Sequence, residues 1–211
     1  MSDFTDEILA DIEWRVSQLS TAKTLPFRYA LSATDKNMLT AFTVPMIYAV
    51  WEGFVRNSFE IYVRELNSLG LERSQFCINI ISHTLEMRFP QFKEPPANYE
   101  KLAKFFKTLT DYFEEEDFRI SSNIPTESNI NLKVINNILL RFNLESLPDD
   151  PYKAGLNKLL QFRNSIAHGD NNILVTTSNI SEFALTVISL MHEIFLRIDK
   201  GYTTQSYLNI E

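Results

Sequence analysis

The feature of this sequence that most constrains its fold is the spacing of apolar residues near the C-terminus. Over about four helical turns they fall on one face of a helix: Phe183, Val187, Ile188, Met191, Ile194, Phe195 and Ile198. This spacing predicts an amphipathic helix that packs one face against a core. Asn179 is predicted as its N-cap, with Glu182 three residues later.

The same period recurs along the chain, which has only five glycines and eight prolines among its 211 residues. We predict further helices over about residues 3–21, 35–67, 74–90, 98–118, 129–142 and 152–168. Pro45 should kink or interrupt the second of these near Val44. The segment "FCINII" could alternatively form a strand. The pattern predicts one all-α domain over residues 1–211, with a candidate helical insertion at about 70–130.

Particular residues are predicted to set the ends and faces of these helices. Gly70 and Gly169 are stop signals, Asn129 is a candidate N-cap, and Asp150 with Pro151 predicts an N-cap followed by a proline at the first helical position. The helix at 98–118 is predicted to face inward through Leu102, Phe105, Phe106, Leu109 and Phe113.

Composition narrows the functional classes. The net charge of −7 argues against a nonspecific nucleic-acid binder, because such proteins bind largely through Lys and Arg. The single Cys77 cannot form an internal disulfide, and the N-terminus has no apolar run of the kind found in signal peptides. The longest apolar stretch, Ala41 to Trp51, is too short to span a bilayer. We therefore expect a cytoplasmic protein without a membrane partner.

The stretch "QFRNSIAHGD", residues 161–170, carries the residues with the clearest chemical potential. On a helical projection, Arg163 lies at the centre of an apolar stripe that includes Leu156, Leu159 and Leu160. A buried guanidinium requires a carboxylate, several hydrogen-bond acceptors, an anionic ligand or a hydrated interface. Asn164 lies on the neighbouring polar face, one turn from His168.

These three residue types suit phosphodiester cleavage. Arginine matches phosphate oxygens with a planar set of donors, histidine transfers protons near neutral pH, and asparagine can orient either side chain. RNA supplies its own nucleophile, the 2′-OH, so metal-bound water is not required. The alternative is structural: a buried arginine–carboxylate pair and a terminal histidine favoured by the helix dipole.

The segment "RNSIAHG" resembles the signature of the HEPN superfamily, with Arg163, Asn164 and His168 at its matching positions. The resemblance is nearest to the RiboL-PSP and MAE-type branches, since "AVWEGFVRN" and "NINLKVINNILLRFNL" also look similar to their sequences. It implies a HEPN-type helical bundle in which the motif ends the penultimate helix.

The resemblance also implies an activity. Active members are metal-independent endoribonucleases that dimerise, so that two motif helices form one composite cleft. By this comparison Arg163 would stabilise the phosphorane, His168 would transfer a proton or position the phosphate, and Asn164 would orient them. Glu52 is a candidate carboxylate partner that would pair with Arg163 from behind the site. Alternatively, it is a surface acid that pairs with Arg56.

The implied partners are a structured RNA, such as a tRNA loop, a second copy of the chain, and an inhibitory antitoxin or defence-system protein. The sequence contains no Cys/His pattern for zinc and no phosphate-binding glycine motif, so we predict no metal and no cofactor. The alternative function is a non-catalytic HEPN domain that binds a nucleotide or protein partner as a regulatory or adaptor module.

Overall fold

The computed structural model describes residues 3–94, 98–115, 117–127, 129–169 and 174–209. Within these ranges it contains the helices α1 Asp3–Thr24, α2 Ala33–Ser68, α3 Ile78–Arg88, α4 Tyr99–Glu114, α5 Leu132–Arg141, α6 Tyr152–Ala167 and α7 Thr177–Thr203. The strand-like pairing in the described residues is an isolated bridge between Phe76 and Leu208, and "INII" within "FCINII" is helical. The predicted all-α fold is confirmed. Residues 95–97, 116 and 128 of the candidate insertion lie outside the described residues.

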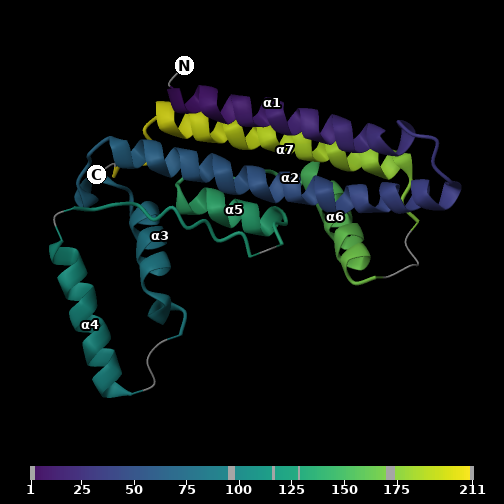
Figure 1. Cartoon of the computed structure of the whole chain (residues 1–211). Coiled ribbons are helices and arrows are strands. Elements are labelled where there is room, and N and C mark those ends of the chain that lie inside the picture. Colours follow the sequence, from purple (N-terminus) through teal and green to yellow (C-terminus); the bar gives the residue numbers. More distant parts are fainter. Residues whose placement is uncertain (1–2, 95–97, 116, 128, 170–173, 210–211) are drawn as a thin grey trace.

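Three long helices form the body of the protein. α1 runs opposite to α2 and α7, and the three lie side by side along the molecule (Figure 1). Their apolar faces meet in a core whose largest fully buried side chains include Trp51, Tyr62, Phe54, Phe59, Phe142 and Phe183. Burying one such side chain contributes about 1.5–3 kcal/mol, so the core supplies most of the driving force for this arrangement.

Pro45 was predicted to kink or interrupt the second helix; it does not interrupt it, because α2 continues from Ala33 to Ser68 with the proline inside it. Proline removes one backbone donor. The helix is held on both sides of that position by Val44 and Ile47, which are fully buried. α2 and α7 are long and apolar enough to cross a membrane by length and composition, a property they share with core helices of soluble bundles.

Two predicted N-caps are displaced along the chain. The cap of α5 is Asn131, whose side chain accepts from the amide of Val134, and not Asn129. The cap of α7 is Thr176, which forms a reciprocal capping box with Asn179. Asn179 is therefore the third helical residue. In both cases a capping side chain two or three residues away satisfies the free amides of the first turn.

The start of α6 also differs from the prediction. Pro151 and not Asp150 occupies the cap position, and the amide of Lys153 donates to the carbonyl of Asp149 at 2.8 Å just before the helix. The two predicted stop signals are confirmed, since Gly70 and Gly169 have φ values of +63° and +75°. Glycine adopts this left-handed conformation without the Cβ clash that most other residues meet there.

The α4 helix lies away from the three long helices, beside α3 (Figure 1). The prediction that its apolar residues all face inward is wrong: Phe106 and Phe113 are about half exposed (56% and 48%), and Tyr112 is the buried residue of the helix. The C-terminal end of α4 is held by Arg73, which donates to the carbonyls of Phe113 and Tyr112 at 2.7 and 2.8 Å. An apolar period fixes which face of a helix is apolar, but not whether a partner covers it.

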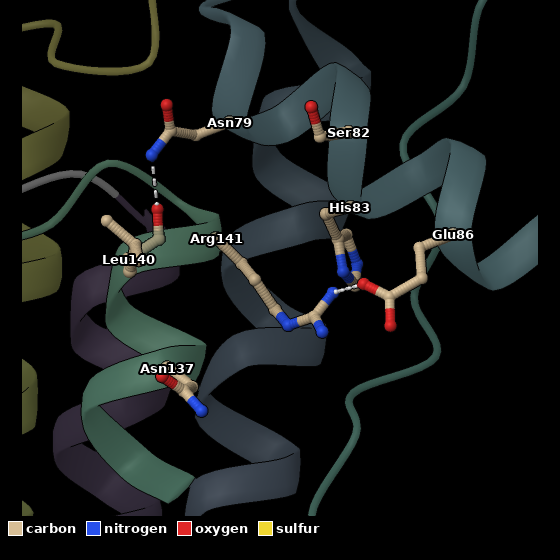
Figure 2. A pocket seen from close by; sticks show the side chains of 7 residues that line it. All are labelled: Asn79, Ser82, His83, Glu86, Asn137, Leu140 and Arg141. Atoms are coloured by element: carbon tan, nitrogen blue, oxygen red, sulfur yellow. Dashed lines mark hydrogen bonds and ion pairs between the residues drawn. The ribbon is translucent and has the colours of Figure 1, made fainter. Parts of the chain in front are cut away.

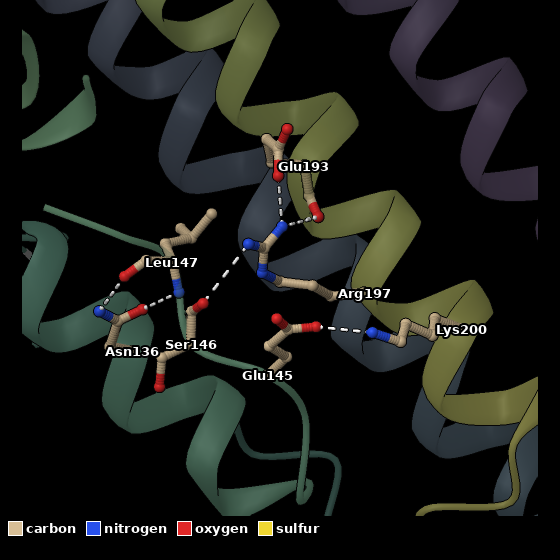
Figure 3. Close-up of polar contacts among 7 residues, drawn as sticks. All are labelled: Asn136, Glu145, Ser146, Leu147, Glu193, Arg197 and Lys200. Atoms are coloured by element: carbon tan, nitrogen blue, oxygen red, sulfur yellow. Dashed lines mark hydrogen bonds and ion pairs between the residues drawn. The ribbon is translucent and has the colours of Figure 1, made fainter. Parts of the chain in front are cut away.

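A polar network fixes the loop that leads from α5 to α6 (Figure 3). Asn136 on α5 both donates to the carbonyl of Leu147 (3.0 Å) and accepts from its amide (2.8 Å). On α7, Lys200 pairs with Glu145 at 2.8 Å and Arg197 donates to the carbonyl of Ser146 at 3.4 Å. These contacts tie the loop to α7, and the loop in turn sets where α6 begins.

Candidate functional site

The α6 helix is anchored by the residues that precede the motif. Leu156 and Leu159 are fully buried, and Phe162 packs edge-to-face on Phe183 of α7 with ring centroids 5.4 Å apart. At Gly155 the two helices approach so closely that a Cβ would lie 2.8 Å from the Thr186 hydroxyl. This packing against the core and α7 fixes the position of the last turn of α6.

Arg163 lies in that last turn and is half-buried, neither enclosed in the core nor free in solvent. Its guanidinium carbon is 4.4 Å from the centre of the Tyr48 ring of α2, within cation–π distance. One terminal nitrogen donates to the side-chain oxygen of Asn164 at 2.8 Å. The guanidinium of Arg163 is thus held by two contacts, the ring of Tyr48 and the side-chain oxygen of Asn164.

His168 and Asn164 mark the end of the helix. The backbone amide of His168 donates to the carbonyl of Asn164 at 3.0 Å, and the amide of Gly169 donates to the carbonyl of Ile166 at 3.1 Å. The imidazole of His168 is exposed, whereas Asn164 is half-buried against Arg163. The three motif residues are therefore together at one helix end, with the histidine accessible to a ligand.

Sequence reasoning missed Tyr48. It is almost completely buried, and its hydroxyl accepts from the amide of Ile130 at 3.0 Å. Burial raises the pKa of Tyr48, and the nearby Glu52 carboxylate adds to the rise, while the Ile130 hydrogen bond and Arg163 oppose it. The phenol therefore stays neutral beneath the Arg163 cation. Its position one turn before Glu52 was the available signal, but a buried tyrosine at core spacing gives no indication of a partner on α6.

Glu52 lies beside this cluster. Its ion pair is with Arg56, at 3.9 Å, and it accepts from the Thr126 hydroxyl at 3.4 Å. The pairing with Arg56 that sequence spacing allowed is therefore present. The Glu52 carboxylate is also near the Tyr48 hydroxyl, since it contributes to the raised pKa of Tyr48.

Trp51 and Gly53, within the "AVWEGFVRN" segment of α2, each make contacts with another part of the chain. The Trp51 indole donates to the carbonyl of Ile130 at 3.1 Å, so Tyr48 and Trp51 together hold both backbone groups of that residue. Gly53 leaves space for Arg15 of α1, which donates to the carbonyl of Val50 at 2.9 Å and would meet a Cβ at 2.8 Å. These few residues of α2 join α1, the segment before α5, and α6.

The other histidines lie apart from the motif. His83 is buried on α3, its Nε2 is 3.0 Å from the carbonyl of Ser121, and burial lowers its pKa. It borders an open cavity of about 330 Å³ between α3 and α5, where Arg141 pairs with Glu86 at 2.6 Å (Figure 2). His192 is exposed on α7. The described residues contain no cluster of three or more His, Cys, Asp or Glu side chains arranged to hold a metal ion.

An all-α bundle in which an Arg-Asn pair and a histidine end the penultimate helix defines a HEPN-type domain. The chain belongs to the HEPN_MAE_28990-like HEPN family, whose model matches residues 4–207. No curated protein and no solved structure matches the chain. The match covers nearly the whole sequence, and HEPN domains are in general ribonucleases or nucleotide-binding modules.

Proposed function

We propose that this HEPN domain is a metal-independent endoribonuclease whose active site combines Arg163, Asn164 and His168 from two copies of the chain. The observation that supports this most is the state of Arg163: a half-buried guanidinium, stacked on Tyr48 and held by Asn164, five residues before an exposed histidine. A cation fixed before the substrate arrives stabilises developing charge without reorganisation.

In the proposed reaction the 2′-oxygen of a ribose attacks the adjacent phosphorus, and the bond from phosphorus to the 5′-oxygen breaks. A base takes the 2′-proton, and an acid gives a proton to the leaving 5′-oxygen. His168 would perform one of these transfers and the partner's His168 the other. Arg163 would neutralise the extra negative charge of the phosphorane, with Asn164 holding its orientation. The products are a 2′,3′-cyclic phosphate and a 5′-hydroxyl.

The proposal extends to the biological setting. We infer a cytoplasmic toxin or phage-defence effector that a partner protein holds in check, an inference supported by family membership alone. With a net charge of −7, the substrate is better matched to a particular RNA shape, such as an exposed tRNA loop, than to bulk RNA.

The test is to incubate total RNA with EDTA and either wild-type protein or His168→Ala, and then to map 5′-hydroxyl ends by direct phosphorylation. Wild type should cut, and His168→Ala should be at least about 100-fold slower, the typical contribution of general acid–base catalysis. His192→Ala removes another exposed histidine, on α7, and should cut normally. Equal cleavage by wild type, Arg163→Ala and His168→Ala would refute the enzyme reading.

The non-catalytic alternative predicts another outcome. If wild type cuts no RNA, and Arg163→Ala chiefly lowers the melting temperature or splits an oligomer, the motif is structural. The chain would then act as a regulatory or adaptor module.

A further inference from the structure

One face of α4 is apolar but is left open by the described part of the chain. Tyr99, Phe106 and Phe113 have exposed fractions of 84%, 56% and 48%, and they follow one another two turns apart along the helix. Leu102 and Leu109 lie between them and are half-buried. We call these five residues the α4 stripe. An exposed apolar patch of this kind is typical of a surface that contacts another molecule.

The α4 stripe has the spacing of a helix–helix contact. Its members alternate intervals of three and four residues, which is the repeat by which two helices interlock their side chains. The exposed ring of Phe106 contacts Phe105, with ring centroids 5.8 Å apart, and that of Phe113 contacts Tyr112 at 5.6 Å. Phe105 and Tyr112 in turn contact Phe89 at the end of α3. Because neighbouring rings support the exposed ones, the stripe is formed before a partner binds.

A row of charged residues runs along the open side of the α4 stripe. Each exposed aromatic residue is followed in the sequence by one member of this row: Glu100, Lys107 and Glu114. Successive residues lie about 100° apart around a helix, so the three share one side of the stripe, in the order acidic, basic, acidic. Within the residues that the structure describes, none of the three makes an ion pair. We call them the α4 charge row, and all three charges are available to a partner.

The other charges on and around α4 lie away from the stripe. Three of them are about 140–160° around the helix from Phe106, on its opposite side: Lys101, Lys104 and Asp111. Glu94 borders a cavity on that opposite side. Next to α3, Arg88 pairs with Glu115 at 2.6 Å, and Arg73 donates to carbonyls at the end of α4. The α4 charge row therefore sets the charge pattern that a partner on the stripe would meet.

We propose that the α4 stripe binds an amphipathic helix of a different protein, which carries basic, acidic and basic residues beside its apolar face. Such a helix would cover the exposed rings and place an opposite charge against each member of the α4 charge row. The row reads the same in both directions, so it does not choose between a parallel and an antiparallel partner. An RNA strand fits less well, because two of the three charges are carboxylates. This surface does not depend on the proposed function.

A second copy of α4 also fits the stripe less well than a different protein. In an antiparallel pair the same sides of both helices meet, so Glu100 would lie near the partner's Glu114, and the two Lys107 side chains near each other. In a parallel pair the charge row would lie beside the α3 side of the other copy, where Arg73 and Arg88 already bind the end of α4. Neither arrangement gives the charge row an opposite charge, which favours a partner with another sequence.

Binding of two designed peptides to the full chain tests the surface and its charge pattern. Both are labelled helical peptides of about three heptads with leucine at the a and d positions. Beside the leucines one carries Lys, Glu and Lys at intervals of seven, and the other carries Glu, Lys and Glu. In fluorescence anisotropy at low salt, wild type should bind the Lys-Glu-Lys peptide at least about fivefold more tightly. The triple variant Glu100→Lys, Lys107→Glu, Glu114→Lys should reverse this preference, and equal binding of both peptides by wild type would overturn the proposal.

Substitutions in the stripe test its apolar contacts. Phe106→Asp should weaken binding of the Lys-Glu-Lys peptide at least about tenfold, because the bound ring is withdrawn from water. Tyr99→Asp should also weaken it while circular dichroism stays unchanged, since an acidic residue in the first turn favours the helix. Leu185→Asp, at an exposed position of α7, is the matched control and should bind like wild type. Unchanged binding by both stripe variants would overturn the proposal.

The other possible occupants give distinct results. If Phe106→Asp lowers the mass measured by light scattering, the stripe belongs to a second copy, and if it weakens RNA binding, the stripe belongs to RNA. Either result would overturn the proposal. A wild type that prefers the Lys-Glu-Lys peptide yet cuts no RNA would refute the proposed function alone.

Discussion

The Tyr48 side chain offers a test in which two interactions can be separated. Tyr48→Phe removes the hydroxyl that accepts from the buried amide of Ile130 at 3.0 Å, but keeps the ring beneath Arg163. Leaving a buried amide without its acceptor costs about 1–3 kcal/mol. For a protein of this size, that loss lowers the melting temperature by roughly 2–12 °C.

Tyr48→Leu removes the ring as well. A cation–π contact of a half-buried guanidinium at 4.4 Å contributes about 0.5–2 kcal/mol. A double-mutant cycle with Arg163→Met, which keeps much of the aliphatic stem, isolates this term. We expect a coupling of about 0.5–2 kcal/mol between Tyr48→Leu and Arg163→Met, and almost none between Tyr48→Phe and Arg163→Met, because only the leucine variant removes the ring.

The assay is urea denaturation followed by circular dichroism, with free energies taken from midpoints at a shared slope. Two results would refute the reasoning. One is an equal coupling energy for the phenylalanine and leucine variants, which would mean that the ring does not hold the guanidinium. The other is a fully stable Tyr48→Phe, which would mean that the Ile130 amide does not depend on the phenol.

Three further predictions follow from other parts of the molecule. Gly169→Ala should destabilise the protein by about 1–2 kcal/mol in denaturant melts, because the residue has φ +75° and L-residues are strained there; an unchanged midpoint would contradict this. Arg141 and Lys93 hold the pKa of Glu86 at about 2, below its usual 4.5. Its stabilisation is therefore complete above about pH 4.5 and lost as the pH falls toward 2, so Glu86→Gln should be less stable at pH 7 and should show a shallower acid-induced decline. Under the proposed function, RNA binding by a dimer with two Arg163 contacts should weaken with salt at a log–log slope of about −1.4 in fluorescence anisotropy, and a slope several times steeper would indicate an extended basic surface.

The helices could be predicted from sequence because each is specified locally. The apolar period of α7 and the positive-φ glycines that follow α2 and α6 depend only on neighbouring residues. Helix starts were less predictable, since Asn129 and Asn131 both offer a suitable side chain within two residues. The burial of α4 was not predictable, because its apolar face is set by the sequence but its neighbours are set by the packing of α3.

The motif residues could be predicted from the sequence, whereas the residue that supports Arg163 could not. Arg163, Asn164 and His168 fall within six residues, so a helical projection alone brings them to one end of α6. Tyr48 comes from a helix more than a hundred residues earlier, and its role depends on how α6 crosses α2. The projection correctly raised the question of what supports the arginine in an apolar stripe. The answer, an aromatic ring on another helix, required the tertiary structure.

The acidic charge of the chain is consistent with the proposed chemistry. A protein that binds RNA through many Lys and Arg contacts stabilises the bound substrate as much as the transition state, which does not speed the chemical step. Here Arg163 is a single cation per chain at the motif, fixed by Tyr48 and Asn164 before any phosphate arrives. Under the proposed function, its attraction would be largest for the phosphorane, which carries an extra negative charge, and a preorganised cation would not have to be reoriented in the transition state. An acidic surface around two such sites would repel RNA that fails to reach both, so substrate choice would follow the shape of the RNA and not its overall charge.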